Sequence, residues 1–550
     1  MAVDELILGA QELSAGRWES ARERFKAALA IEETIEGLDG LGQALWWLGN
    51  IASAVELRER AYAGLVRRGD ALKAADVALW LSVEYSSLYG NTAAANGWLA
   101  RAERLVEALP RCAEQGWVIF RRGKRTTDAV AAEHDARAVV AIAREVTDRD
   151  LEIAGINLLG RALLGQGRAN EGFALLDESM AAALGGEVDD LRVVAETCCS
   201  TIVACERTME LVRATQWCQV TDHFARRHGY QPVLAFCRIT YATVLIATGR
   251  WSQAEPELLA ALDTYRKTFP AMCAHAINKL ALLRLAQGRL AEADELLKGY
   301  ADNPATAQAV ATLHLGNGAL GLAVRVARRR LDVVGDDALL APPFLFILVE
   351  AALAQKDGVA AKEAARRLAA LVEPTRCAGL IAPVKLAEGM IAAFEDDDRA
   401  AKVLGQALEM FDQLGMPLEG ARTRLHLAAF LASRDPDLAV ADAQAAKTTF
   451  EELGARRMAD WASELLRKLG AGGRSGPRIA EPLSRREQEV VELLGLGLSN
   501  AEIGARLFIS PKTVEHHVGH VLAKLHLKNR AAVAAHVARS GPSASASSSR

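Results

Sequence analysis

The side chains best placed to do chemistry lie near the C terminus, on one predicted helix. Ser510 and Pro511 are typical of a helix start, because a hydroxyl caps free N–H groups and proline suits the first position. An apolar face then repeats through Val514, Val518, Val521, Leu522 and Leu525. The opposite face is polar or small, with His520 beside it: Lys512, Glu515, His516, Gly519 and Ala523. Such a face offers hydrogen-bond donors and acceptors but no nucleophile or metal-ligand set, so it predicts recognition and not catalysis.

Two shorter predicted helices precede this one and position it. Ser484 with Glu487, and Ser499 with Glu502, are capping boxes that open helices over about 484–497 and 500–508. Their inward residues are Val490, Val491, Leu494, Ile503 and Leu507. A fourth helix is expected from about Asn529. Short helices joined by a tight turn, with a capped polar helix behind them, are the components of a helix-turn-helix, whose N-terminal end enters the major groove of DNA.

About 50 contiguous residues of this region resemble one known family. The stretch reads LSRREQEVVELLGLGLSNAEIGARLFISPKTVEHHVGHVLAKLHLKNRAAV. It resembles the C-terminal DNA-binding domain of LuxR/NarL regulators, whose pattern is LTxREREVLxLLAxGLSNKEIAxRLxISxxTVxxHxxxIxxKLxVxxR. The resemblance implies a four-helix DNA-binding domain and a role in transcription.

The family's functional positions carry over residue by residue. Ser499 and Asn500 match the opening of the scaffold helix, which touches backbone phosphate. The next matches are the TV dipeptide that holds the recognition helix on the core, the positions that face the groove, and a lysine that contacts phosphate. Residues 530–539 match the usual dimerisation helix. Together with the polar face, the resemblance implies these DNA-binding residues: Ser499, Asn500, Ser510, Lys512, Thr513, Val514, Glu515, His516, Gly519, His520, Lys524 and Arg530.

Three positions depart from the family pattern. Gly504 replaces the customary Ala, and His526 replaces the customary Gly of KLG. Gly519 stands where the family often has a long side chain. A glycine inside a helix costs roughly 1 kcal/mol and makes no hydrogen bond to a base edge. Base readout is therefore expected from Lys512, Glu515, His516 and His520 or from DNA shape, and the operator sequence stays open.

Most of the chain before residue 470 reads as amphipathic helices of about 12–18 residues with a repeated turn. The unit Gly-[Arg/Asn]-x-x-x-Ala, or a close variant, recurs with a mean period of about 38 residues, which accommodates about a dozen helical hairpins. It begins at Gly16, Gly49, Gly90, Gly167, Gly249, Gly288 and Gly316. Degenerate turns are expected from His134 and Arg207, and near residues 357, 398 and 435.

This turn has a physical rationale. Glycine ends one helix in a left-handed conformation, and the small residue that follows lets the next helix pack closely. Stacked hairpins bury their apolar faces and create a concave groove. The region resembles tetratricopeptide repeats, with an armadillo- or HEAT-like array as the alternative. The predicted fold class is all-α: a tetratricopeptide-like α-solenoid over 1–469, a flexible linker over 470–482, a LuxR-type helix-turn-helix domain over 483–540, and a disordered tail over 541–550.

Tryptophans and cysteines leave two alternatives open in the repeat region. The tryptophans at 18, 46, 47, 80, 98, 117, 217 and 251 could line a ligand groove, but Trp18 and Trp251 follow Gly-Arg where packing between repeats is expected. Five cysteines cluster at 198, 199, 205, 218 and 237 in apolar helical sequence. A redox sensor is one interpretation, and buried core thiols are the default.

Catalytic and nucleotide-binding motifs are missing. The stretch Gly116 to Thr126 resembles a phosphate loop, but six residues lie between its glycines, where the loop needs four, and Arg125 follows Lys124. The run Asp396-Asp397-Asp398 is interpreted as a solvated turn. We therefore predict no enzyme activity, no cofactor and no metal site.

Charge and hydropathy set the expected partners and compartment. The net charge is +3 over residues 483–540 but −8 over 1–482, which suits an anionic partner at the C-terminal end. The first five residues include Asp4 and Glu5, where a signal peptide needs basic residues. The richest apolar stretch, 339–349, is too short to span a bilayer. These features predict a cytoplasmic bacterial protein.

The sequence therefore predicts a transcriptional regulator. Its expected partners are promoter duplex DNA, RNA polymerase, a second copy of the chain on the DNA, and a protein or small-molecule effector in the repeat groove. The alternative is a repeat adaptor for protein assembly that keeps a vestigial helix-turn-helix.

Overall fold

The computed structural model describes residues 2–227, 231–471 and 485–507, together with the separate positions 514, 517, 518, 521, 522, 530 and 533. Every regular element in these ranges is a helix, as the sequence predicts. None of the helices described there is long and apolar enough to cross a membrane. The chain divides into two compact units, residues 1–472 and 473–550.

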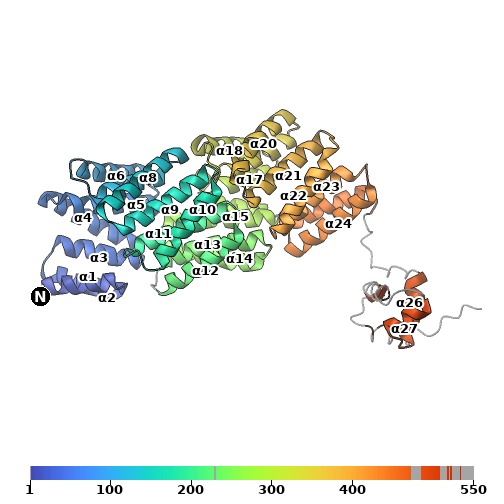
Figure 1. Ribbon diagram of the computed structural model, residues 1–550, viewed down its shortest axis with the longest axis horizontal. Coiled ribbons are helices and arrows are strands. Elements are labelled where there is room, and N and C mark those ends of the chain that lie inside the picture. Colours follow the sequence, from blue (N-terminus) through green and yellow to red (C-terminus); the bar gives the residue numbers. More distant parts are fainter. Residues whose placement is uncertain are drawn as a thin grey trace, which may run out of the picture. The chain divides into compact units, whose positions relative to one another are not determined.

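The N-terminal unit is a succession of helices in which each packs on its predecessor (Figure 1). In its first half these are α1 (Ala2–Ser14), α2 (Trp18–Ile31), α3 (Ile35–Trp47), α4 (Ile51–Arg68), α5 (Ala71–Tyr89), α6 (Thr92–Val106), α7 (Ala113–Arg125), α8 (Ala129–Val146), α9 (Arg149–Gly165), α10 (Ala169–Leu184), α11 (Leu191–Arg207) and α12 (Leu211–Arg227).

The second half continues the same pattern, with two short 3₁₀ turns inserted. Its elements are α13 (Gln231–Ala247), α14 (Trp251–Lys267), η1 (Pro270–Met272), α15 (Cys273–Ala286), α16 (Leu290–Leu297), α17 (Ala307–Gly316), α18 (Leu320–Val334), α19 (Pro342–Ala354), α20 (Gly358–Val372), η2 (Glu373–Thr375), α21 (Ala378–Phe394), α22 (Arg399–Gln413), α23 (Pro417–Leu431), α24 (Pro436–Leu453) and α25 (Arg456–Lys468).

The repeated turns are built as the sequence predicts. Six of the seven glycines adopt a positive φ between helices, for example 72° at Gly16 and 77° at Gly249. The alanine that closes the unit is fully buried at Ala21, Ala54 and Ala254. Glycine takes its place at Gly172, where an added Cβ would lie 2.7 Å from the carbonyl oxygen of Gly160. These small residues bring paired helices into close contact.

One predicted turn is wrong and a second is displaced by two residues. The stretch from His134 lies inside α8, where His134 and Arg137 are exposed and Asp135 is buried and accepts from Arg122. At the Gly316 unit, the left-handed residue is Gly318 and Gly316 still belongs to α17. The turns at 207–210, 357, 396–398 and 435 lie where they are expected, between α11 and α12, α19 and α20, α21 and α22, and α23 and α24.

Odd-numbered helices also form a row of their own. Each one from α5 to α23 contacts the next odd-numbered helix, and α1 contacts α3. Segments far apart in sequence then meet as the row winds round. The rings of Trp46 and Phe269 lie 5.9 Å apart, and the backbone N–H of Ala338 donates to the carbonyl of Gly165 over 3.0 Å. The winding therefore brings α10, in the fifth pair, against η2, which follows the tenth.

The second unit contains two fully described helices, α26 (Arg485–Gly495) and α27 (Asn500–Leu507). The predicted apolar stripe forms its core. Buried members are Val490, Val491, Leu494, Ile503, Val514, Val521 and Val533, with Leu507, Val518 and Leu522 packed against them. The described residues Val514, Val518, Val521, Leu522 and Val533 thus lie on the same core as α26 and α27.

Candidate nucleic-acid interface

The turn between α26 and α27 is a tight, hydrogen-bonded corner that leads into the predicted scaffold helix. Gly497 has a φ of 79°, which favours glycine. Its N–H donates to the carbonyl of Leu494 over 3.0 Å, and the N–H of Leu498 donates to that of Leu493 over 3.3 Å. These two bonds are a Schellman motif, which ends α26 and redirects the chain within three residues.

The predicted capping box opens α27. The N–H of Ser499 donates to Oε2 of Glu502 over 2.7 Å, and the N–H of Glu502 donates to Oγ of Ser499 over 3.3 Å. The hydroxyl of Ser499 donates to the same carboxylate over 2.7 Å. These hydrogen bonds hold the pKa of the Glu502 carboxyl below its usual range. The start of α27 is thus fixed by its own side chains.

Three valines that follow α27 in the sequence anchor their part of the chain to the core. Val514, Val521 and Val533 are each fully buried in the core of the unit. Val514 is the second residue of the predicted TV dipeptide, so its burial agrees with a seating role and leaves it no free surface for a base contact. His517 is half-buried, as expected for a residue near the core.

Two further predicted contact residues have definite surroundings. Nη2 of Arg530 donates to the carbonyl oxygen of Leu498 over 2.6 Å, which ties position 530 to the corner before α27. Sequence reasoning missed this tie, since the two residues are 32 apart and a backbone acceptor leaves no signal in sequence. The Oδ1 atom of Asn500 is buried and has no hydrogen-bond partner among the described residues.

The remaining predicted contact residues lie outside the described part of the structure. They are Ser510, Lys512, Thr513, Glu515, His516, Gly519, His520 and Lys524. Of the predicted set, the structure therefore describes Ser499, Asn500, Val514 and Arg530, and it brings Arg530 to the residue that precedes Ser499.

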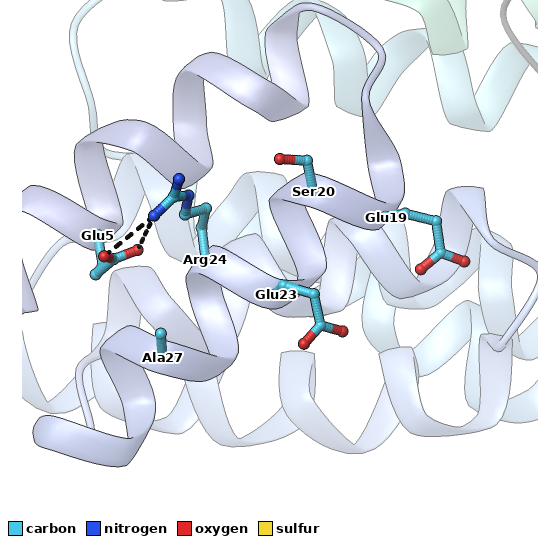
Figure 2. Close-up of a pocket in the computed structure, with 6 residues that line it drawn as sticks. All are labelled: Glu5, Glu19, Ser20, Glu23, Arg24 and Ala27. Carbon is cyan, nitrogen blue, oxygen red and sulfur yellow. Dashed lines mark hydrogen bonds and ion pairs between the residues drawn. The ribbon is translucent and has the colours of Figure 1, made fainter.

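The N-terminal unit offers no comparable DNA surface at its first helices. Figure 2 shows a surface depression between α1 and α2, lined by Glu5, Glu19, Ser20, Glu23, Arg24 and Ala27. Its one arginine, Arg24, is paired with Glu5 at 3.2 Å. The carboxylates around it would repel phosphate.

The tryptophans of this unit serve mainly in packing. Trp18 stacks on Trp47 with ring centroids 4.4 Å apart, and Trp46 meets both Trp47 and Trp80 edge-on at 5.1 Å. These four rings and that of Trp251 are all buried. The interpretation of Trp18 and Trp251 as contacts between repeats is confirmed.

The clustered cysteines are core thiols. Burial raises the pKa of Cys198, Cys205 and Cys218 to about 12 and raises that of Cys199 further. A thiol that stays protonated is a poor nucleophile, which disfavours the redox-sensor interpretation. No group of metal-binding side chains is found within the described ranges.

The structure also explains the loop-like stretch at Gly116 and the acidic run at Asp396. Residues 116–125 belong to α7, so they form no phosphate loop. In the acidic run, Asp396 has a φ of 61° and pairs with Arg434 at 2.6 Å, while Asp397 accepts from the N–H of Arg399 over 2.9 Å. The run is a turn, as predicted.

Comparison with known proteins identifies the family of the domain in the second unit. Residues 481–537 match the family model for bacterial regulatory proteins, luxR family. An HTH-type transcriptional regulator of Mycobacterium tuberculosis is 45% identical over 73 residues, 13% of this chain and 8% of that protein. The oxygen regulatory protein NreC of Staphylococcus carnosus is 48% identical over 48 residues, 9% of this chain and 22% of its own length. The transcriptional regulatory protein LnrK of Bacillus subtilis is 36% identical over 92 residues, 17% and 41% of the two chains.

These matches cover less than half of each relative and at most 17% of this chain. Among solved structures, the crystal structure of the APC/C hetero-tetramer Cut9–Hcn1 aligns with 83% of this chain and 95% of its own, with a TM-score of 0.46 and 14% identity. The repeat architecture rests on the helix pairs and buried turn residues described above. Residues 481–537 therefore belong to the bacterial luxR family of helix-turn-helix regulatory domains, joined in this chain to an all-helical repeat region.

Proposed function

We propose that the chain is a sequence-specific transcriptional regulator that binds promoter duplex DNA through residues 483–540. The observation that carries the proposal is the match of residues 481–537 to the luxR family model, and the capping box of α27 and the valine core of this unit support it. A recognition helix must sit rigidly on such a core before its outer face can enter the major groove.

The proposed contacts divide into two classes. Lys512, Glu515, His516 and His520 are the candidates for base edges, with Gly519 allowing close approach of the backbone. The candidates for phosphate contacts are residues at helix starts and cationic side chains: Ser499, Asn500, Ser510, Thr513, Lys524 and Arg530.

The N-terminal unit is the proposed sensor, and the helix over 530–539 is the proposed dimer contact on DNA. The repeat unit carries net negative charge and the DNA-binding unit net positive charge, which keeps nucleic acid on the second unit. RNA polymerase is a further proposed partner, reached when the protein is bound at a promoter.

Binding of the full chain to DNA fragments from the genome that encodes it tests the proposal. We expect selective retention of a few fragments, with an affinity that falls steeply as salt rises. Lys524→Ala should weaken binding to all sequences, whereas His516→Ala should change the preference among them. Lys402→Ala removes an exposed lysine of α22 and serves as the matched control.

Absence of selective binding at low salt would contradict the proposal. It would favour the alternative, a repeat adaptor with a vestigial helix-turn-helix. Equal effects of the two substitutions on every sequence would contradict the division into base and phosphate contacts.

A further inference from the structure

A small cavity lies where two distant parts of the repeat unit meet. It has a volume of about 120 Å³. One wall comes from the start of α8 with the turn before it and from α9 and α11, and the other from the loop between α18 and α19. That loop is held in place by the hydrogen bond from Ala338 to Gly165. The space is large enough for several waters or for a small oxyanion.

Two arginines line this cavity, and neither forms an ion pair among the described residues, although the charge of Asp337 attracts both. Nη2 of Arg161 donates to the carbonyl oxygens of Gly123 and Lys124, over 3.3 and 3.4 Å, and no ion pair holds the guanidinium within the described residues. Arg207 has neither a hydrogen bond nor an ion pair there, and its side chain is open to solvent. Unpaired guanidinium groups at one cavity are strong donors for an anion.

The charges around the cavity leave an excess of positive potential. Burial and the charge of Arg207 lower the pKa of both Arg161 and Arg330, so these cations lie near one another. Glu206 is neutralised by Lys279, its partner at 2.5 Å. The acid that lines the cavity is Asp337, whose Oδ1 accepts from the N–H groups of Leu339 and Leu340 over 2.7 and 3.0 Å.

Uncharged donors complete the lining. Thr127 and Ser200 present hydroxyls, and no hydrogen bond within the described part of the chain uses either of them. The remaining lining is aliphatic, from residues such as Val203, Leu339 and Leu340. A planar or tetrahedral oxyanion could thus meet guanidinium groups and hydroxyls on the wall formed by α9, α11 and the turn before α8, with aliphatic side chains for a short carbon chain.

We propose that this cavity binds a small oxyanionic metabolite, a carboxylate or a phosphate monoester, through Arg161 and Arg207. The oxyanion would be held by α9 and α11, and a short carbon chain would lie against Leu339 and Leu340 of the loop over 335–341. The assignment of this ligand as the regulatory signal rests on the proposed function; the binding site itself does not.

Calorimetric titration of the full chain, without DNA and at constant ionic strength, tests the site. Inorganic phosphate and malonate are the two probes, with chloride as the reference anion. We expect saturable binding of at least one probe, and the one preferred identifies the headgroup. Arg207→Gln should weaken it about tenfold or more, since a charge-assisted hydrogen bond contributes that much. Arg328→Gln, an exposed arginine of α18, is the control for charge and should leave binding unchanged.

A second variant keeps the test independent of folding defects. Asp337→Asn removes the negative charge of the cavity but keeps an Oδ1 acceptor for Leu339 and Leu340, so it should strengthen anion binding several-fold. A misfolded protein would not gain affinity. No heat of binding from either probe, or equal affinity in Arg207→Gln, would overturn the site. DNA binding measured without the anions is a separate result, so failure of this site and failure of the regulator proposal are distinguishable.

Discussion

The two units pack their helices together with different kinds of residues. In the repeat unit, helices approach closely because glycine and alanine stand at their contacts, and buried charges join the pairs to one another. In the C-terminal unit, a few valines form the core, and hydrogen bonds between side chain and backbone fix the helix start. A long array can distribute its stability over many interfaces, whereas a small domain depends on each cap and each core residue.

The clearest example of the difference is a buried ion pair in the repeat unit. Arg58 on α4 and Glu84 on α5 are both completely buried, with Nη1 and Oε1 2.8 Å apart. The guanidinium of Arg58 lies 3.6 Å from the ring of Trp80, and Arg192 on α11 lies 4.0 Å from the same ring. Burial outweighs the attraction of Arg58 and raises the pKa of Glu84 to about 7. This polar layer joins α4 and α5 to a helix three pairs further along.

Breaking that ion pair should give the largest effect. Arg58→Met leaves Glu84 buried and unpaired, and we expect a loss of about 3–5 kcal/mol in the free energy of unfolding. Hydrogen exchange should rise in α3–α5 and α11 and stay unchanged in α26 and α27. The surface pair of Arg329 and Asp302 is the control, since Arg329→Ala should cost less than about 1 kcal/mol.

A double variant separates charge from packing at this site. Arg58→Met with Glu84→Leu should recover most of the lost stability, because no uncompensated charge remains. If the double variant is no more stable than Arg58→Met alone, the ion pair is not the reason for the loss.

Small residues at helix contacts provide a second, intermediate effect. Gly172→Ala adds a Cβ 2.7 Å from a carbonyl oxygen and from Leu164, so it should destabilise the repeat unit by about 1–3 kcal/mol. Gly97 in α6 is exposed, with nothing within 4 Å of an added Cβ, so Gly97→Ala should stabilise by up to about 1 kcal/mol. Thermal melting of both variants checks the opposite signs, and a shared sign would contradict the role of close packing.

The smallest expected effect is local to the C-terminal unit. Ser499→Ala removes the cap of α27 and should cost about 1 kcal/mol. Hydrogen exchange should increase in α27 while the repeat helices keep their protection. Ser252→Ala, at an exposed position of α14, is the matched control. Equal changes in both units would show that the units are not independent in stability.

Sequence alone identified the features that depend on near neighbours. The capping box at Ser499 involves residues three apart, and the turn at Gly16 involves one helix end and the next helix start, so both follow from local chemistry. The same logic failed at His134, where one of the polar residues typical of a turn, Asp135, is instead buried in a helix by its pairing with Arg122. It also misplaced the left-handed residue from Gly318 to Gly316, because either glycine satisfies the pattern.

Contacts between distant residues had no such signal. Arg530 binds the carbonyl of Leu498, and every residue has a carbonyl, so the sequence gives no reason to choose that one. The preference among DNA sequences, in turn, depends on side chains that the fold presents to a partner, and the sequence names their types without their directions.

What the sequence determined by itself was the helical class, the repeated turn and the family of the C-terminal domain, since each is encoded in residues close together in the chain. Only the tertiary structure decided that Arg58 pairs with Glu84 across two helices, and that Arg161 and Arg207 share a cavity with Asp337. These meetings depend on how far the repeat row turns at every pair. That angle is the sum of many small packing choices, and no single residue specifies it.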